Sequence, residues 1–128
     1  KVYKVVIFGI MKIEKFEDII AWQKARELTI SLYAALKNNR DFSFKDQMLR
    51  ASVSIMNNIA EGFERRGDKE LSHFLFIAKG SCGELRSMLY LAKDLKYFEV
   101  GQLENYNKLT LDISRLLSAF ITSINKNI

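Results

Sequence analysis

The stretch Arg50–Gly62 reads Arg-Ala-Ser-Val-Ser-Ile-Met-Asn-Asn-Ile-Ala-Glu-Gly, a helical pattern that carries two serines, two asparagines and a glutamate. A helix turns by about 100° per residue, which places four apolar residues near one line: Ala51, Ile55, Ile59 and Phe63. The flanks of this line carry Ser54, Asn57, Asn58 and Glu61. Buried polar groups are normally paired with one another. We therefore expect these side chains either to hydrogen-bond in a contact between helices or subunits or to face a site.

Two further blocks of sequence accompany this stretch. One lies upstream, Phe16-Glu17-Asp18-Ile19-x-x-Trp22-x-Lys24-Ala25, and one downstream, Phe74-Leu75-x-Ile77-Ala78-x-Gly80-Ser81-x-x-Glu84-Leu85. The central block is Gln47-x-x-Arg50-Ala51-x-x-Ser54-Ile55-x-x-Asn58-Ile59-Ala60-Glu61-Gly62. In this order the three blocks resemble the four-helix bundle family of 23S rRNA intervening-sequence proteins. Met56 stands where that family usually has proline, and Phe42-Ser43 where a Phe-Pro pair is common, so the entry and bend of the second helix are open.

The resemblance implies a bundle that assembles into a ring-shaped homopentamer, encoded in some bacteria inside an insertion of the large ribosomal RNA gene. The chain is also similar to the accessory variability protein of diversity-generating retroelements, a pentameric bundle that contacts a reverse transcriptase and nucleic acid. The matched motifs supply the candidate residues for a helix or subunit interface: Arg50, Ser54, Asn58, Glu61, Gly80, Ser81 and Glu84.

Length and composition indicate one all-α domain. The chain has 128 residues, no proline, six glycines and 48% hydrophobic residues, which suits long helices joined by short turns. Periodicity and capping residues predict four helices, at 17–38, 43–66, 68–97 and from just after Gly101 to 125. Ser43 is the expected cap of the second helix and Asp68 that of the third. Short connections predict an antiparallel up-down-up-down four-helix bundle.

Residues 1–10 differ in character from the rest of the chain and precede Met11. Their apolar run is too short for a secretory core or a membrane span. We expect a leader, strand-like in part, that folding does not need, followed by a bundle domain at residues 11–128. Without Lys1 and Lys4 the chain has 18 basic and 15 acidic residues, a net charge of +3 instead of +5. This charge permits an anionic partner without requiring one.

The sequence offers little to catalysis or to metal binding. Cys82 is the only cysteine, so the chain can form no internal disulfide, and a reducing cytoplasm is the expected compartment. Glu70 and His73 have the spacing of a di-iron helix motif, but such a site needs two of these motifs and the chain has one histidine. Glu61 and Glu84 are conceivable as a carboxylate pair, yet they fit better as interface groups that pair with Arg50 or Arg86. We expect no enzyme activity, no metal and no cofactor.

Basic residues form two groups. Lys79, Arg86 and Lys93 follow one another at intervals of seven residues, which keeps them on one helix face, and Lys96 is close by. Arg65, Arg66 and Lys69 form a second cluster at the turn between the second and third helices. Either group can be a solvated face or can contact phosphates.

Two hypotheses for function remain open at this point. The first is a non-catalytic homo-oligomer that binds structured RNA or serves as a nucleic-acid accessory factor. The second is an assembly or protein-interaction scaffold without nucleic-acid affinity.

Gly80 and Gly83 inside the third helix cost about 1 kcal/mol each relative to alanine. A close helix contact there, in the bundle or between subunits, would explain them.

Overall fold

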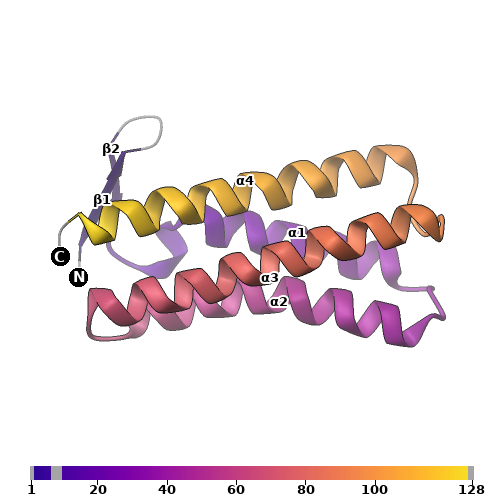
Figure 1. Ribbon diagram of the computed structural model, residues 1–128, viewed down its shortest axis with the longest axis horizontal. Helices are drawn as coiled ribbons and strands as arrows, with labels where there is room; N and C mark the ends of the chain where they lie inside the picture. Colours follow the sequence, from indigo (N-terminus) through magenta and orange to yellow (C-terminus); the bar gives the residue numbers. More distant parts are fainter. Residues whose placement is uncertain (1, 7–9, 127–128) are drawn as a thin grey trace.

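The computed structural model describes residues 2–6 and 10–126. Four helices form the body of the protein: α1 (Ile20–Leu36), α2 (Phe42–Glu64), α3 (Asp68–Asp94) and α4 (Val100–Asn125). They are preceded by an antiparallel hairpin of β1 (Tyr3–Val6) and β2 (Ile10–Ile13) and by a short 3-10 helix, η1 (Phe16–Asp18), as Figure 1 shows. The expected four-helix body is confirmed, and the hairpin is an addition to it.

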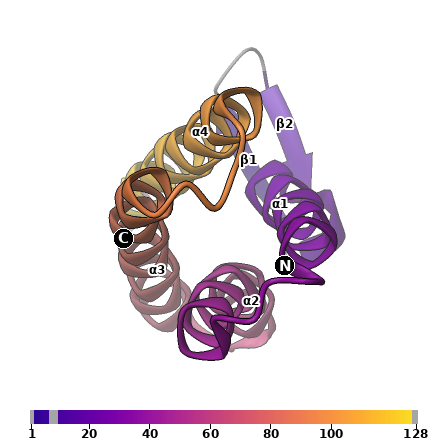
Figure 2. The ribbon, with the colours of Figure 1, turned by 90° about the vertical axis from the view of Figure 1, so that its right-hand side faces the viewer.

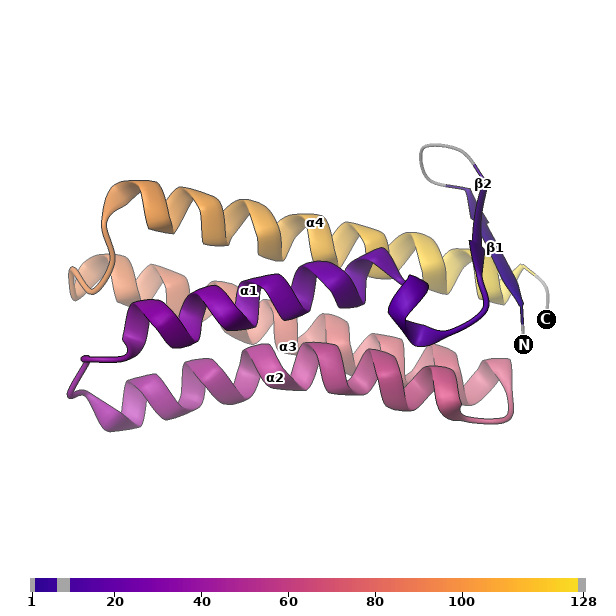
Figure 3. The ribbon, with the colours of Figure 1, turned by 180° about the vertical axis from the view of Figure 1, so that it is seen from behind.

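The helices surround a single core. α1 packs on α2 and α4, and α3 also packs on α2 and α4, so that α1 and α3 lie diagonally opposite (Figure 2). The α1–α2 and α3–α4 connections lie at one end of the bundle (Figures 1 and 3). The α2–α3 connection and the hairpin lie at the other end. Such short connections leave each helix beside the next one in the chain.

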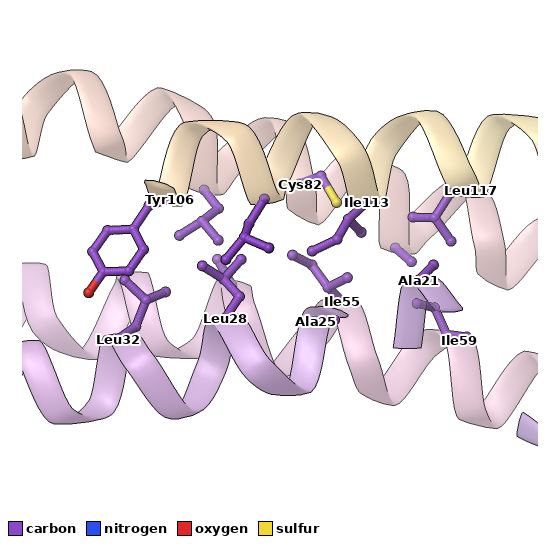
Figure 4. Close-up of a cluster of buried hydrophobic side chains, with 14 of the residues drawn as sticks. Ala21, Ala25, Leu28, Leu32, Ile55, Ile59, Cys82, Tyr106, Ile113 and Leu117 are labelled. Carbon is purple, nitrogen blue, oxygen red and sulfur yellow. The ribbon is translucent and has the colours of Figure 1, made fainter. Parts of the chain in front are cut away.

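Each helix contributes one apolar stripe to the core. Figure 4 shows Ala21 and Ala25 of α1, Ile55 and Ile59 of α2 and Ile113 of α4 meeting there. Each fully buried leucine or isoleucine stabilises the fold by about 1.5–3 kcal/mol. Helical spacing in the sequence also predicts Tyr33 and Leu95 as members of these stripes. That prediction is wrong: Tyr33 is 52% exposed and Leu95 is 44% exposed, because each lies at the edge of its stripe.

Two helices begin elsewhere than predicted. α1 begins at Ile20 and not at Glu17, because Ile19 is extended (φ −76°, ψ 115°) and separates η1 from α1. The Asp18 carboxylate accepts hydrogen bonds from the Glu14 and Lys15 N–H groups at 3.0 and 3.2 Å at the start of η1. The Asp41 carboxylate caps α2 by accepting a hydrogen bond from the Phe44 N–H at 3.2 Å. Ser43, the predicted cap, is therefore already inside the helix.

The ends of α3 and α4 also differ from the prediction. Gly67 occupies the cap position of α3, and Asp68 is the first helical residue. α3 stops at Asp94, and Lys96 follows in the left-handed region with φ 59°. α4 begins at Val100, where the Glu99 N–H donates to the Gln102 side chain at 3.0 Å, so Gly101 lies inside the helix.

A tyrosine-aspartate contact ties together each end of the bundle. At one end the Tyr97 hydroxyl donates to Asp41 at 2.6 Å, and its ring packs on Phe44. This hydrogen bond lowers the pKa of Asp41 and raises that of Tyr97. The α3–α4 connection is thereby joined to the start of α2.

At the other end of the bundle, the hairpin supplies the tyrosine. The Tyr3 hydroxyl donates to Asp68 at 2.5 Å, and its ring packs edge-on against Phe63 and Phe120 at 5.8 and 5.7 Å. Burial, and secondarily Asp68, raise the Tyr3 pKa. Because β2 runs from Ile10 to Ile13, the hairpin crosses the domain boundary expected after residue 10.

Candidate subunit and nucleic-acid surfaces

Polar residues of the central motifs meet along the contact between α2 and α3, here called the α2–α3 seam. The Ser54 and Ser81 hydroxyls share a hydrogen bond of 2.8 Å. The Asn58 amide donates to the Ser54 carbonyl at 2.8 Å and to its hydroxyl at 3.0 Å. Nearer the start of α2, the Gln47 amide donates to Glu84 at 2.6 Å. These residues therefore satisfy one another within one chain, in a contact between α2 and α3.

The carboxylates Glu61 and Glu84 have other partners within the chain than the arginines expected for them. Arg50 pairs with Asp46 at 2.9 Å and Glu61 with Arg65 at 2.8 Å, both one turn apart on the surface of α2. Glu84 pairs with Gln47, so the expected pairing of Glu61 and Glu84 with Arg50 or Arg86 is wrong. The Gln47 partner was foreseeable, because Gln47 opens the central motif.

The close approach between helix backbones occurs at Gly62, not at Gly80 or Gly83. A Cβ at Gly62 would lie 2.6 Å from the Phe74 Cβ, a distance that side chains do not tolerate. At Gly80 and Gly83 a Cβ would meet nothing within 4 Å, and both residues are exposed. An explanation of these two glycines by contacts within the chain is therefore wrong, and a contact between subunits stays a prediction.

Exposed apolar side chains surround these two glycines. Phe76 is 55% exposed and Tyr90 is 69% exposed, with Gly80, Gly83 and Ser87 between them on the same side of α3. Ile77 and Leu91 extend the apolar surface toward α2. We call this surface the α3 face.

Lys79, Arg86 and Lys93 lie beside the α3 face, on the flank that helical spacing turns away from the seam and toward α4. We call them the basic row. Lys79 and Arg86 are half-buried, whereas Lys93 is exposed. Lys96 follows the end of α3, in the α3–α4 connection.

The second basic cluster lies at the α2–α3 turn. The Arg65 guanidinium stands 4.9 Å over the Phe74 ring and pairs with Glu61. Arg65 and Lys69 line a shallow pocket of about 350 Å³ with Glu70, His73 and Phe74. Lys69 lies about 15 Å along α3 from Lys79 and about 80° around it, so the two basic groups do not share one face.

Among the residues considered for metal binding or redox chemistry, Cys82 lies apart from Glu70 and His73. Glu70 and His73 lie at the surface near the start of α3, and no three histidine, cysteine, aspartate or glutamate side chains of the described chain form a ligand set. Burial raises the pKa of Cys82 to about 12, and Arg86 and Lys79 offset this only partly. Its thiol is therefore protonated at neutral pH and lies inside the core.

The family model of the 23S rRNA-intervening sequence proteins matches residues 17–119, which comprise all but the last turns of the four-helix body. The chain belongs to this family. The hairpin lies outside the matched residues. In the described part of the protein, no helix combines the length and apolar composition needed to span a membrane.

A solved structure shares the fold of this family member. It is the crystal structure of a protein of unknown function from the S23 ribosomal protein family of Bacteroides thetaiotaomicron. The two chains are 26% identical with a TM-score of 0.74, and the alignment covers 79% of this chain and 97% of the other. None of the curated proteins matches the chain.

Sequence reasoning missed one surface, a groove that runs along α2 and is lined on the α1 side by Tyr33. We call it the α1–α2 groove. Two adjoining hollows of about 700 and 330 Å³ share Tyr33, Asp46 and Leu49 among their lining residues. Phe42, 67% exposed, stands at one end, and Arg50, Val53 and Ser54 line the other. The only hint in the sequence was Tyr33, whose helical position at the margin of the apolar stripe fits burial and exposure equally.

Proposed function

We propose that this protein is a non-catalytic homo-oligomer of up-down bundles, closed into a ring, that binds structured RNA in the cytoplasm. The observation that carries the RNA part is the basic row, which aligns three cations on one side of α3. Membership of a family named for an intervening sequence of 23S rRNA makes ribosomal RNA the polyanion to test first.

The basic row is short, so its contribution to affinity must come from repetition. Each phosphate that a cation neutralises releases condensed counterions, which makes binding salt-dependent and largely independent of base sequence. Three cations per chain give weak binding, whereas a ring presents the row several times to one RNA. We therefore expect weak, salt-sensitive binding that depends on the oligomer.

Binding of labelled 23S rRNA fragments, measured by fluorescence anisotropy at increasing salt, tests this proposal. The logarithm of the binding constant should fall linearly with the logarithm of the salt concentration. Each lost phosphate contact should reduce the slope by about 0.7 to 0.9. The triple substitution Lys79→Glu, Arg86→Glu, Lys93→Glu should abolish binding and leave the oligomer intact.

A matched control separates the effect of the basic row on RNA affinity from the effect of the net charge of the protein. The triple substitution Lys12→Glu, Lys15→Glu, Lys126→Glu changes the net charge equally at exposed positions away from α3, and it should change the affinity little. The RNA proposal fails if the wild-type protein retains no ribosomal RNA fragment at about 50 mM salt, where such contacts are strongest.

The exposed apolar α3 face favours a second candidate function, an assembly or protein-interaction scaffold without RNA affinity. Contiguous exposed apolar surface marks interaction sites more often than it marks a bare monomer surface. A partner protein, for example a reverse transcriptase, belongs to this alternative. An oligomer that forms normally and binds no RNA would make this the better description.

A further inference from the structure

Two unpartnered surfaces lie on different sides of the bundle. The α3 face carries two projecting aromatic side chains, Phe76 and Tyr90, on one helix. The α1–α2 groove runs along α2, with Tyr33 of α1 and Phe42 at its rim. Figure 2 shows that α1 lies diagonally opposite α3. Each surface exposes large apolar side chains. The two share no residue, although the groove reaches Ser54, which hydrogen-bonds to Ser81 of α3.

We propose that the α3 face of one copy docks into the α1–α2 groove of the next copy. The assembly is then head-to-tail, with a different surface used on each side of every chain. This inference rests on the proposed homo-oligomer and deepens it by naming the two surfaces that meet.

The shapes of the two surfaces complement each other. Phe76 and Tyr90 are fourteen residues apart, or about 21 Å along α3. The groove runs beside α2 from Phe42 to Ser54, or about 18 Å. Between the two aromatic residues, a Cβ at Gly80 or Gly83 would have no atom of the same chain within 4 Å, so the surface there is low and open. Projecting side chains of one surface can thus enter the depressions of the other.

The charges at the ends of the surfaces are also complementary. The α3 face ends in Lys69 at the α2–α3 turn and in Asp94 at the opposite end, and both are exposed. Lys45 lines the groove at its α1–α2 end, and exposed Glu64 continues the groove side of α2, two heptads beyond Arg50. If neighbouring copies are related by rotation about an axis parallel to the bundle, Lys69 is level with Glu64 and Asp94 with Lys45.

The arrangement has a consequence for symmetry. A two-fold dimer uses the same patch on both chains, whereas a head-to-tail contact leaves one free surface on each terminal copy. Because the α3 face and the groove belong to different helices, a copy bound through one surface still offers the other. Repetition of the contact gives a ring when the rotation closes.

Two single substitutions block one surface each. Gly80→Arg places a long charged side chain in the low, open part of the α3 face, where the chain itself has room for it. Tyr33→Glu places a charge on the exposed rim of the groove. Gly101→Arg is the matched control, because Gly101 is also an exposed helical glycine with no atom within 4 Å of its Cβ position. Circular dichroism and thermal melting verify that each variant folds.

Size-exclusion chromatography with light scattering should show an oligomer for the wild type and for Gly101→Arg. Gly80→Arg and Tyr33→Glu should each be monomeric, and an equimolar mixture of the two should form a one-to-one dimer. This rescue requires two different surfaces, since each variant retains the one that the other has lost.

Three results would overturn the inference. If Gly80→Arg remains a full oligomer, the α3 face is not the interface, although the proposed homo-oligomer would still stand. If Tyr33→Glu alone forms dimers, the α3 face pairs with itself. A monomeric wild type at tens of micromolar would remove the homo-oligomer together with this inference.

Discussion

At the scale of single residues, Gly62 and Gly101 are both helical glycines, but their surroundings are opposite. Gly62 is buried where α2 meets α3, and Gly101 is exposed at the start of α4. A Cβ at Gly62 would require the Phe74 and Leu71 side chains and part of the backbone of α3 to move, because Phe74 is touched at its own Cβ. The seam between Gln47 and Asn58 depends on this same close packing of α2 on α3.

We expect Gly62→Ala to lower the free energy of unfolding by about 1–3 kcal/mol, the usual cost of overpacking a tight contact. Urea unfolding followed by circular dichroism measures it. Gly101→Ala is the control and should be neutral or slightly stabilising, since alanine is the better helix former. Equal effects of the two substitutions would show that α2 and α3 are not in close contact at Gly62.

At the scale of elements, the hairpin ties the α2–α3 turn to α4. Tyr3 reaches Asp68 at the start of α3, Phe63 near the end of α2 and Phe120 on α4. Ile13 of β2 is also buried. These contacts change what we expect of residues 1–10, which the sequence indicated to be dispensable.

A chain that starts at Met11 should still form the bundle but melt at a lower temperature, because it loses the Tyr3 ring contacts and the hydrogen bond to Asp68. Tyr3→Phe should reproduce only part of this loss.

The pKa of Tyr3 is raised in the folded state, so the stability that its hydroxyl contributes is complete below the ordinary tyrosine pKa of about 10. That contribution should diminish as pH rises further. An unchanged melting temperature after deletion would restore the original expectation.

At the scale of the whole molecule, the two proposals make one joint prediction. Gly80→Arg adds a positive charge close to the basic row, so electrostatics within one chain would strengthen RNA binding. If affinity depends on a ring that presents the row repeatedly, this monomeric variant should nonetheless bind RNA at least tenfold more weakly than the wild type, in line with the gain that multivalent binding provides.

The measurement is RNA anisotropy on samples whose oligomeric state is checked under the same conditions. Gly101→Arg carries the same added charge and should remain oligomeric and bind RNA at least as well as the wild type. Tighter binding by monomeric Gly80→Arg would show that single chains suffice.

The four helices and their core stripes were predictable from sequence because they rest on local periodicity. A stripe such as Leu103, Tyr106, Thr110, Ile113 and Leu117 specifies a helix and its buried side together. Polar motif residues such as Ser54, Asn58 and Ser81 were likewise identified as a contact. Caps were less secure, since Asp41 and Ser43 are both good caps and only the geometry of the α1–α2 connection selects Asp41.

The sequence by itself determined the four-helix bundle, its family and the identity of its polar seam, because these depend on spacing along the chain. Tertiary structure decided which glycine is crowded, since Gly62 and Gly80 differ only in what another helix brings near them. It also decided that Tyr3 meets Asp68, 65 residues further along the chain. The tertiary structure likewise decided the α1–α2 groove, because a surface formed by two helices exists only once they have packed.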